Sequence, residues 1–235
     1  MAVSLVAGLL AAGPSFADPI TPGDQVDVKN NAGTVFTPSL VAGDSNGLFT
    51  NLTITVNGSN KSVSAGMFVL DYRDANDASS PWQQFLTFCL SPDVLLEPFD
   101  NPYTAYSLTG SSYAASASRI SEFWGRYRDS ITNDVTAAAF QVGLWELAFD
   151  STAGLNSGSF RLASSGAVLN TVQGWLGSLD GTGPRASGLM VLVDKAGAPN
   201  VQDLITQQVP EPGTLTLLGL GLAGVAFASR RRRSA

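Results

Sequence analysis

Two side chains of this sequence could react with each other, the thiol of Cys89 and the carboxamide of Gln141. Cys89 is the single cysteine of the chain and lies between two large apolar residues. Gln141 lies within residues 137–149, where Glu146 is the only other polar side chain. A carboxamide buried in such a segment costs roughly 2–7 kcal/mol unless it is hydrogen-bonded. We therefore expect a partner to face Gln141.

The chemistry open to this pair is the formation of an internal thioester. The Cys89 thiolate would attack the carboxamide carbon of Gln141, and ammonia would leave. This reaction needs a cysteine, a glutamine and a buried meeting point without water, and it needs no histidine. The alternative is that Cys89 is an inert small hydrophobe and that Gln141 hydrogen-bonds a neighbouring main-chain group. The residues themselves leave both possibilities open.

The composition excludes several other kinds of site. The chain of 235 residues contains no histidine, which excludes a Ser-His-Asp triad, a Cys-His dyad and a histidine zinc site. One cysteine excludes an intramolecular disulfide. The net charge is −6, and Arg230, Arg231, Arg232 and Arg233 lie together at the C-terminus, so the body carries no basic stripe for nucleic acid. We expect no cofactor and no nucleic-acid partner.

Acidic residues offer two further alternatives, an enzyme and a calcium site. The candidates for a glycosidase carboxylate pair are Glu97, Glu122, Glu146 and Asp150, but no local motif singles out two of them. Solvation of a helix face or helix capping accounts for each carboxylate more simply. Residues 71–77 form an acidic loop whose spacing does not match an EF-hand. We therefore expect neither an enzyme nor a metal site.

The hydrophobic periodicity predicts an α+β fold. Alternation over 49–56, an Asn57-Gly58 turn and an apolar stretch over 63–72 predict a β-hairpin, and residues 18–47 are polar and turn-rich. A helical stripe from Ile120 to Ile131 predicts one helix, Asn133 caps a second over 135–149, and a third follows Ser165. Further strands are predicted over 84–90, 189–193 and 201–206. We expect a mostly antiparallel β-sheet with a cluster of about three helices, plus a C-terminal single hydrophobic helix.

Both ends of the chain have the pattern of export signals. Residues 2–12 are apolar, Gly13-Pro14 interrupts them, and the small residues Ser15 and Ala17 fit a signal-peptidase site. At the other end Pro210-Glu211-Pro212 precedes an apolar stretch over 215–228 and then the arginine cluster. These arginines would stop the segment in a membrane with the cluster on the cytoplasmic side. We expect a signal peptide over 1–17, an extracytoplasmic domain over 18–208 and a sorting tail over 209–235.

The tail resembles the PEP-CTERM sorting signal of Gram-negative, exopolysaccharide-producing bacteria. The resemblance covers about a ninth of the chain and rests on Pro210-Glu211-Pro212, the glycine-rich apolar segment and the basic end, in that order. It implies two partners during export, signal peptidase and an exosortase of the inner membrane. It also implies anchoring in the inner membrane before processing and a final place at the cell surface or in the extracellular matrix, as in biofilms.

The segments around the reactive pair resemble the Cys-Gln thioester domains of bacterial surface adhesins. Their glutamine lies in a Thr-Gln-x-Ala-Ile-Trp motif, and Gln141-Val142-Gly143-Leu144-Trp145 keeps the glutamine, a small residue, an aliphatic residue and the tryptophan. Phe140 replaces the threonine, and Gly143 replaces the alanine. Phe88-Cys89-Leu90 is similar to the aromatic-Cys-aliphatic strand of that family.

The resemblance to thioester domains implies roles for four residues. Cys89 would be the thioester donor and Gln141 its acyl partner, Gly143 would let the strand approach the helix, and Trp145 would shield the bond. The partner would be a surface amine, or a hydroxyl of exopolysaccharide, and the function covalent adhesion. The alternative is a non-covalent structural protein of the matrix with an inert, buried cysteine.

Replacing Pro210, Glu211 and Pro212 together with alanine is expected to leave the protein uncleaved in the inner membrane, because the processing enzyme then lacks its motif. Cell fractionation of the wild type and the triple variant measures this. Normal release of the triple variant would mean that the tail is an ordinary membrane anchor.

Overall fold

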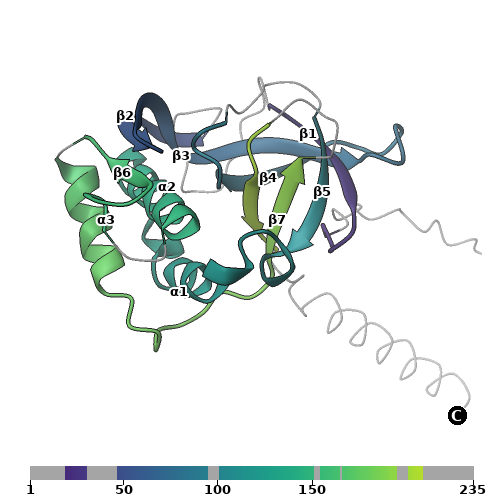
Figure 1. The fold of residues 1–235 in the computed structure, drawn as a ribbon. Helices are drawn as coiled ribbons and strands as arrows, with labels where there is room; N and C mark the ends of the chain where they lie inside the picture. Colours follow the sequence, from purple (N-terminus) through teal and green to yellow (C-terminus); the bar gives the residue numbers. More distant parts are fainter. Residues whose placement is uncertain are drawn as a thin grey trace, which may run out of the picture.

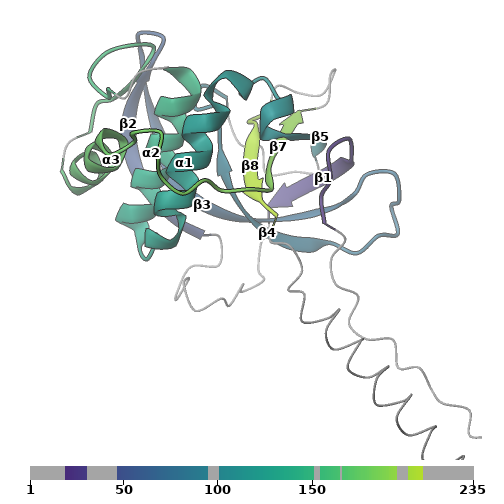
Figure 2. The same cartoon turned by 90° about the horizontal axis from the view of Figure 1, so that it is seen from below.

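Six antiparallel strands close into a barrel, and helices pack beside it (Figures 1 and 2). The computed structural model describes residues 19–30, 47–94, 101–150, 154–164, 166–194 and 201–208. The barrel follows the order β1-β5-β7-β8-β4-β3, and β3 pairs back with β1 to close it, while β2 and β6 extend the sheet beyond β3. The described strands are β1 (Gln25–Asn30), β2 (Gly47–Val56), β3 (Ser59–Asp74), β4 (Gln83–Cys89), β5 (Asn101–Ser107), β6 (Phe160–Leu162), β7 (Leu189–Asp194) and β8 (Leu204–Gln207).

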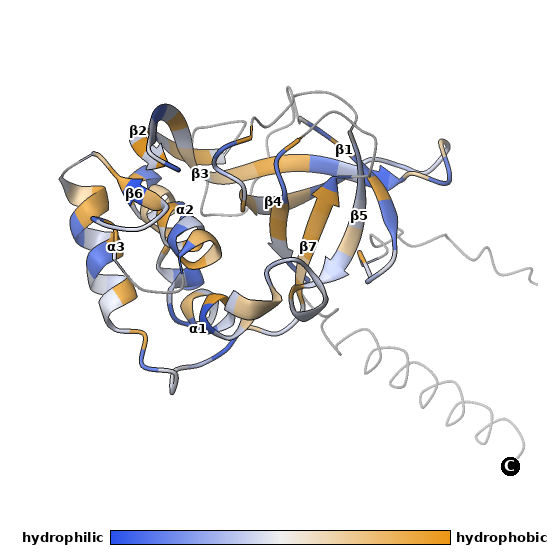
Figure 3. Ribbon diagram, in the orientation of Figure 1, coloured by the Kyte–Doolittle hydropathy of each residue, from blue (hydrophilic) through white to orange (hydrophobic). Residues whose placement is uncertain are grey.

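The long strand β3 belongs to both parts of the sheet. Its first part pairs with β2 up to Phe68, and its second part pairs with β4 and β1. The predicted turn joins β2 to β3, and Asn57 and Gly58 both have positive φ, 49° and 82°, as a two-residue hairpin turn requires. Figure 3 shows β7 as almost entirely hydrophobic, in keeping with its sequence LMVLVD and its place in the middle of the sheet.

Three α-helices of the described residues form the second layer. They are α1 (Ala117–Tyr127), α2 (Asp134–Phe149) and α3 (Ala167–Gly177), and short 3₁₀ turns lie at η1 (Leu108–Gly110), η2 (Ala114–Ser116) and η3 (Arg128–Ser130). Helix α2 contacts β2, β3, β4 and β6 on one side and α1 and α3 on the other. Every residue of α2 from Ala137 to Leu147 is buried. This position between two layers explains why the helix is apolar nearly all round.

Helix α2 begins at the predicted cap. The Asn133 side chain accepts a hydrogen bond from the Thr136 N–H at 3.0 Å, and the Thr136 hydroxyl accepts one from the Asn133 N–H at 3.1 Å. This reciprocal cap satisfies two main-chain donors that the first turn of a helix otherwise leaves without a partner.

The α+β prediction is confirmed at the level of a mostly antiparallel β fold with helices, but the sequence did not predict the closed barrel. Strands β1, β5 and β6 were not predicted, and β1 lies in a segment expected to be turn-rich. The stripe that predicted the first helix was too long. Ile131 follows α1 and η3 in extended backbone, with φ −78° and ψ 108°, and is buried there.

Both predicted export segments lie outside the described residues, as do the C-terminal hydrophobic helix, Pro210-Glu211-Pro212 and the four C-terminal arginines. Within the part of the chain that the structure describes, no helix is both long enough and apolar enough to cross a membrane.

Gly143 allows α1 and α2 to approach closely. A Cβ atom at position 143 would lie 2.3 Å from Cζ of Phe123 on α1, a distance that no real Cβ contact tolerates. The ring of Phe123 cannot withdraw easily, because it is fully buried and its centroid lies 4.9 Å from that of Phe140. The resemblance implied that Gly143 admits the strand; in the structure it admits the neighbouring helix instead.

Gly143→Ala is therefore expected to lower the free energy of unfolding by about 1–3 kcal/mol through overpacking. Gly174→Ala is the matched control, because Gly174 lies on the exposed face of α3 and no atom lies within 4 Å of the added Cβ. The control is expected to raise stability by roughly 0.5–1 kcal/mol. Denaturant unfolding of both variants measures this, and equal effects at the two glycines would contradict the packing described.

Candidate functional site

The carboxamide of Gln141 makes two hydrogen bonds to the main chain of Cys89. The Cys89 N–H donates to Oε1 of Gln141 at 2.8 Å, and Nε2 of Gln141 donates to the Cys89 carbonyl at 2.6 Å. One side chain therefore satisfies both polar main-chain groups of one strand residue. The structure brings together the two residues that the sequence paired, and the contact runs through the main chain of Cys89.

Cys89 has its main-chain groups free for this contact because β3 leaves β4 just before it. The ladder between β3 and β4 ends at the pair Phe68 and Thr87, although β3 itself continues to pair with β2. On the other side of β4, the N–H of Leu90 donates to the Asp203 carbonyl at 2.8 Å. Main-chain groups alternate in direction along an antiparallel strand, so those of Cys89 point to the side that β3 has left. Gln141 takes the place of the missing strand.

The site is closed to water. Gln141 is 0% exposed and Cys89 is 2% exposed. Burial raises the pKa of the Cys89 thiol far above its ordinary value. Burial also raises the pKa of the Tyr103 hydroxyl, and the neighbouring groups of Cys89, Asp203 and Asp194 raise it further. The thiol and the phenol are therefore both held in their neutral forms.

Neighbouring residues of β4 face opposite sides of the strand. The ring of Phe88 packs against the helices, with its centroid 4.8 Å from that of Phe140 and 5.6 Å from that of Trp124. Side chains alternate along a strand, so the thiol of Cys89 stands on the other face, toward the barrel interior. A carboxamide bonded to both main-chain groups of Cys89 lies roughly in the plane of the strand.

Trp145 is buried, but its described ring contact is with β6. Its centroid lies 6.0 Å from that of Phe160, and its indole Nε1 has no hydrogen-bond partner within the described residues. The sequence resemblance implied that Trp145 shields the pair. The ring partners that surround Phe88, next to Cys89, are instead Trp124 and Phe140.

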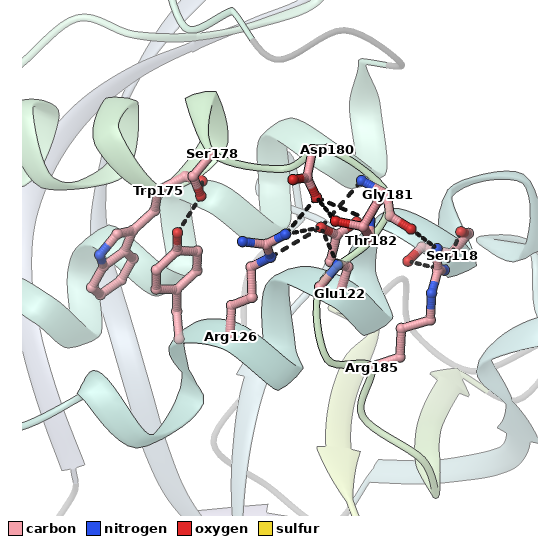
Figure 4. A network of polar contacts seen from close by, with 11 residues as sticks. Ser118, Glu122, Arg126, Trp175, Ser178, Asp180, Gly181, Thr182 and Arg185 are labelled. Atoms are coloured by element: carbon pink, nitrogen blue, oxygen red, sulfur yellow. Dashed lines mark hydrogen bonds and ion pairs between the residues drawn. The ribbon is translucent and has the colours of Figure 1, made fainter.

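Glu122 holds the segment after α3 against α1. Its side chain is 1% exposed, pairs with Arg126 at 2.8 Å, and accepts from the N–H groups of Gly181 and Gly183 at 3.2 and 3.3 Å (Figure 4). Arg126 also pairs with Asp180. The prediction of a solvated helix face is wrong for this residue, because the two glycine N–H groups and Arg126 together compensate its buried charge.

Glu146 and Asp150 also hold loops. Glu146 is 0% exposed, and its Oε1 accepts from the Gly154 N–H at 2.8 Å. Burial raises the pKa of Glu146 to about 7. Asp150 accepts from the N–H groups of Ser159 and Phe160 at 3.0 and 2.9 Å. These contacts give both carboxylates a structural role, although Oε2 of Glu146 is buried without a hydrogen-bond partner among the described residues. Glu97 lies outside the described residues.

The acidic residues near 71–77 line part of a cleft at the end of β3. The cleft has a volume of about 830 Å³, and its lining includes Asp24, Asp74, Asp77 and Tyr72. Asp74 accepts from the Asn76 N–H, and Asp77 accepts from Ser79, so local turns use these carboxylates. Among the described residues, no group of three or more histidine, cysteine or acidic residues is arranged to hold a metal ion.

From the sequence, a main-chain partner for Gln141 was one alternative, but it was not identified as Cys89, and the anchoring roles of Glu122 and Asp150 were missed. No local signal predicts the first, because it depends on where β3 leaves β4. The glycines that face Glu122, in Gly181-Thr182-Gly183, are a weak signal for the second.

Comparison with known proteins assigns the tail alone. The model of the PEP-CTERM protein-sorting motif matches residues 208–233. No curated protein and no solved structure matches the chain.

Proposed function

We propose that this protein is a cell-surface or matrix adhesion module whose Cys89 and Gln141 form an internal thioester. The sorting motif at 208–233 supports an exported protein that an exosortase sorts. The proposal about the body rests on one observation, the buried contact of the Gln141 carboxamide with Cys89 itself. An exosortase and signal peptidase are the partners during export, and the module itself is not an enzyme.

The bond-forming step is an exchange of nitrogen for sulfur. The Cys89 sulfur attacks the carboxamide carbon of Gln141 from the face of the strand on which the thiol stands. The carbon–nitrogen bond then breaks, and the thiol proton leaves with the nitrogen as ammonia. Reacting groups held close together gain much of what orientation can contribute to such a step, and two hydrogen bonds hold the Gln141 carboxamide at the main chain of Cys89.

The main chain of Cys89 assists the same step. Its N–H lies 2.8 Å from Oε1 of Gln141, the atom on which negative charge develops as sulfur attacks. A fixed N–H donor aimed at that oxygen in a dry site stabilises the tetrahedral intermediate. The carbonyl of Cys89, 2.6 Å from Nε2, orients the leaving nitrogen. The absence of histidine does not hinder this arrangement, because the sulfur proton and the leaving nitrogen end in one product.

The completed thioester would capture a nucleophile on another surface. An amine or a hydroxyl attacks the Gln141 carbonyl carbon, the carbon–sulfur bond breaks, and the Cys89 thiol is regenerated. A surface lysine amine or a polysaccharide hydroxyl would serve, and the product would be a covalent amide or ester link to Gln141. Burial of both residues protects the bond from hydrolysis before capture.

A second candidate is a non-covalent matrix protein with an inert cysteine. It is favoured by two observations, the pairing of both polar atoms of the Gln141 carboxamide with main-chain groups and the raised pKa of the Cys89 thiol. In this case Gln141 is purely a structural substitute for a strand.

Intact-mass measurement of the exported protein separates the two candidates. The thioester predicts a mass lower by one ammonia than the sequence requires, uptake of methylamine at Gln141, and a Cys89 thiol that becomes titratable on uptake. Cys89→Ala and Gln141→Ala should both abolish these changes. Gln141→Ala should also lower the free energy of unfolding by about 1–3 kcal/mol or more, because it leaves two buried main-chain groups without partners.

Gln202→Ala is the matched control. Gln202 is 6% exposed, and its carboxamide donates to the Ser91 carbonyl at 2.8 Å, so the variant removes a buried carboxamide that bonds the main chain of Ser91 and not that of Cys89. It should keep the mass loss and the amine uptake. A wild type of full sequence mass, with no amine uptake and alkylation of Cys89 only on denaturation, would overturn the thioester and leave the inert alternative.

A further inference from the structure

One face of the hairpin formed by β2 and β3 carries polar side chains over residues 51–55 and 60–64, next to the stacked, half-buried rings of Phe49 and Phe68 on the same face. Along β2 and β3 the residues facing α2 are apolar or half-buried, and those facing outward alternate with them. The outward set consists of uncharged groups that form hydrogen bonds, together with one arginine from β6. We call this set the polar face, and it comprises Asn51, Thr53, Thr55, Asn60, Ser62, Ser64 and Arg161.

The strand register arranges the polar face in rows. Thr55 lies opposite Asn60 on one side and Arg161 on the other, Thr53 lies opposite Ser62, and Asn51 lies opposite Ser64. Neighbouring strands are ~4.8 Å apart, and same-face residues of one strand are ~6.8 Å apart. The rows therefore form a regular grid of hydroxyl and carboxamide groups, and five members of the grid are exposed: Asn51, Thr53, Asn60, Ser62 and Ser64.

Arg161 is the one charge on this grid, and no described residue pairs with it. Its guanidinium makes no hydrogen bond and no ion pair within the described residues, and its Nε is buried without a partner. Three other cations of the described residues have partners: Arg73 pairs with Asp27, Arg126 pairs with Glu122, and Lys61 donates to the Asp93 carbonyl. In a chain of net charge −6, an unpaired guanidinium indicates a site for an external anion.

The chemistry of the polar face selects among possible occupants. Protein interfaces have an apolar or aromatic core, and Tyr106 on β5 is the only large hydrophobic residue exposed among the described residues. Nucleic acid needs several cations along its phosphates, and an anionic lipid surface needs a basic cluster. One guanidinium in a grid of hydroxyls and carboxamides instead complements a polyhydroxylated chain that carries carboxylates.

We infer that the polar face binds an acidic polysaccharide without forming a covalent bond. A uronic-acid carboxylate pairs with the Arg161 guanidinium in two parallel hydrogen bonds. The sugar hydroxyls hydrogen-bond the exposed rows at Thr53, Ser62, Asn51 and Ser64. This site is distinct from the Cys89–Gln141 contact, because the polar face lies on the side of the sheet that turns away from α2.

Titration calorimetry of the full chain in detergent tests this inference, with an oligogalacturonate as probe. The methyl ester of the same oligomer removes the charge, and oligoglutamate supplies carboxylates without sugar hydroxyls. Arg161→Gln should weaken oligogalacturonate binding at least about tenfold, and Thr53→Val about fivefold. Arg128→Gln, which removes a guanidinium outside the polar face, should leave binding unchanged, as should Cys89→Ala.

Binding should also weaken with rising salt. Failure of the wild type to bind oligogalacturonate would overturn the inference, as would equal binding by Arg161→Gln with its fold intact. Equal affinity for the methyl ester would contradict the role of Arg161, and equal affinity for oligoglutamate would point to a protein partner instead. Cys89→Ala removes the thioester and leaves the polar face intact. A failure of the proposed thioester can therefore be distinguished from a failure of polysaccharide binding.

Discussion

The domain depends on one contact, in which the Gln141 side chain replaces a strand. A buried strand must satisfy its main-chain groups, and β4 loses its neighbour at Cys89 because β3 continues toward β2. The two hydrogen bonds from Gln141 close this gap. They also fix the depth and the rotation of α2, since a carboxamide reaches both groups of one residue from a single position. The two hydrogen bonds therefore fix the position of the helix layer on the barrel.

The rest of the packing follows from that position of α2. A helix held between the barrel and two other helices has no face for solvent, which explains its apolar sequence. Gly143 gives Phe123 the space to approach, and Glu122 then holds the segment after α3 on the outer side of α1. The same contact creates the dry meeting point that thioester chemistry requires. Structural and chemical interpretations of Gln141 therefore use the same two hydrogen bonds.

The sequence predicted those elements of the fold that depend on residues close together in the chain. The β2–β3 hairpin follows from alternation and from Asn57-Gly58, and α2 follows from its cap at Asn133. Barrel closure was not predictable in this way, because the β1–β3 and β1–β5 pairings join distant segments and β5 contains few apolar residues. The pairing of Cys89 with Gln141 was predicted from residue types. A main-chain partner for Gln141 was one of two alternatives, but the sequence did not identify this partner as the main chain of Cys89, because that depends on where β3 and β4 diverge.

Hydrogen exchange at the main-chain amide of position 89 tests the central contact most directly. The comparison is best made in the Cys89→Ala background, where no thioester can form, with and without Gln141→Ala. With Gln141 present, this amide should exchange as slowly as the paired amides of β4, because it donates to Oε1. With Gln141→Ala it should exchange many times faster while the amide of Leu90, bonded to Asp203, stays protected. Equal protection of position 89 in both proteins would contradict the account.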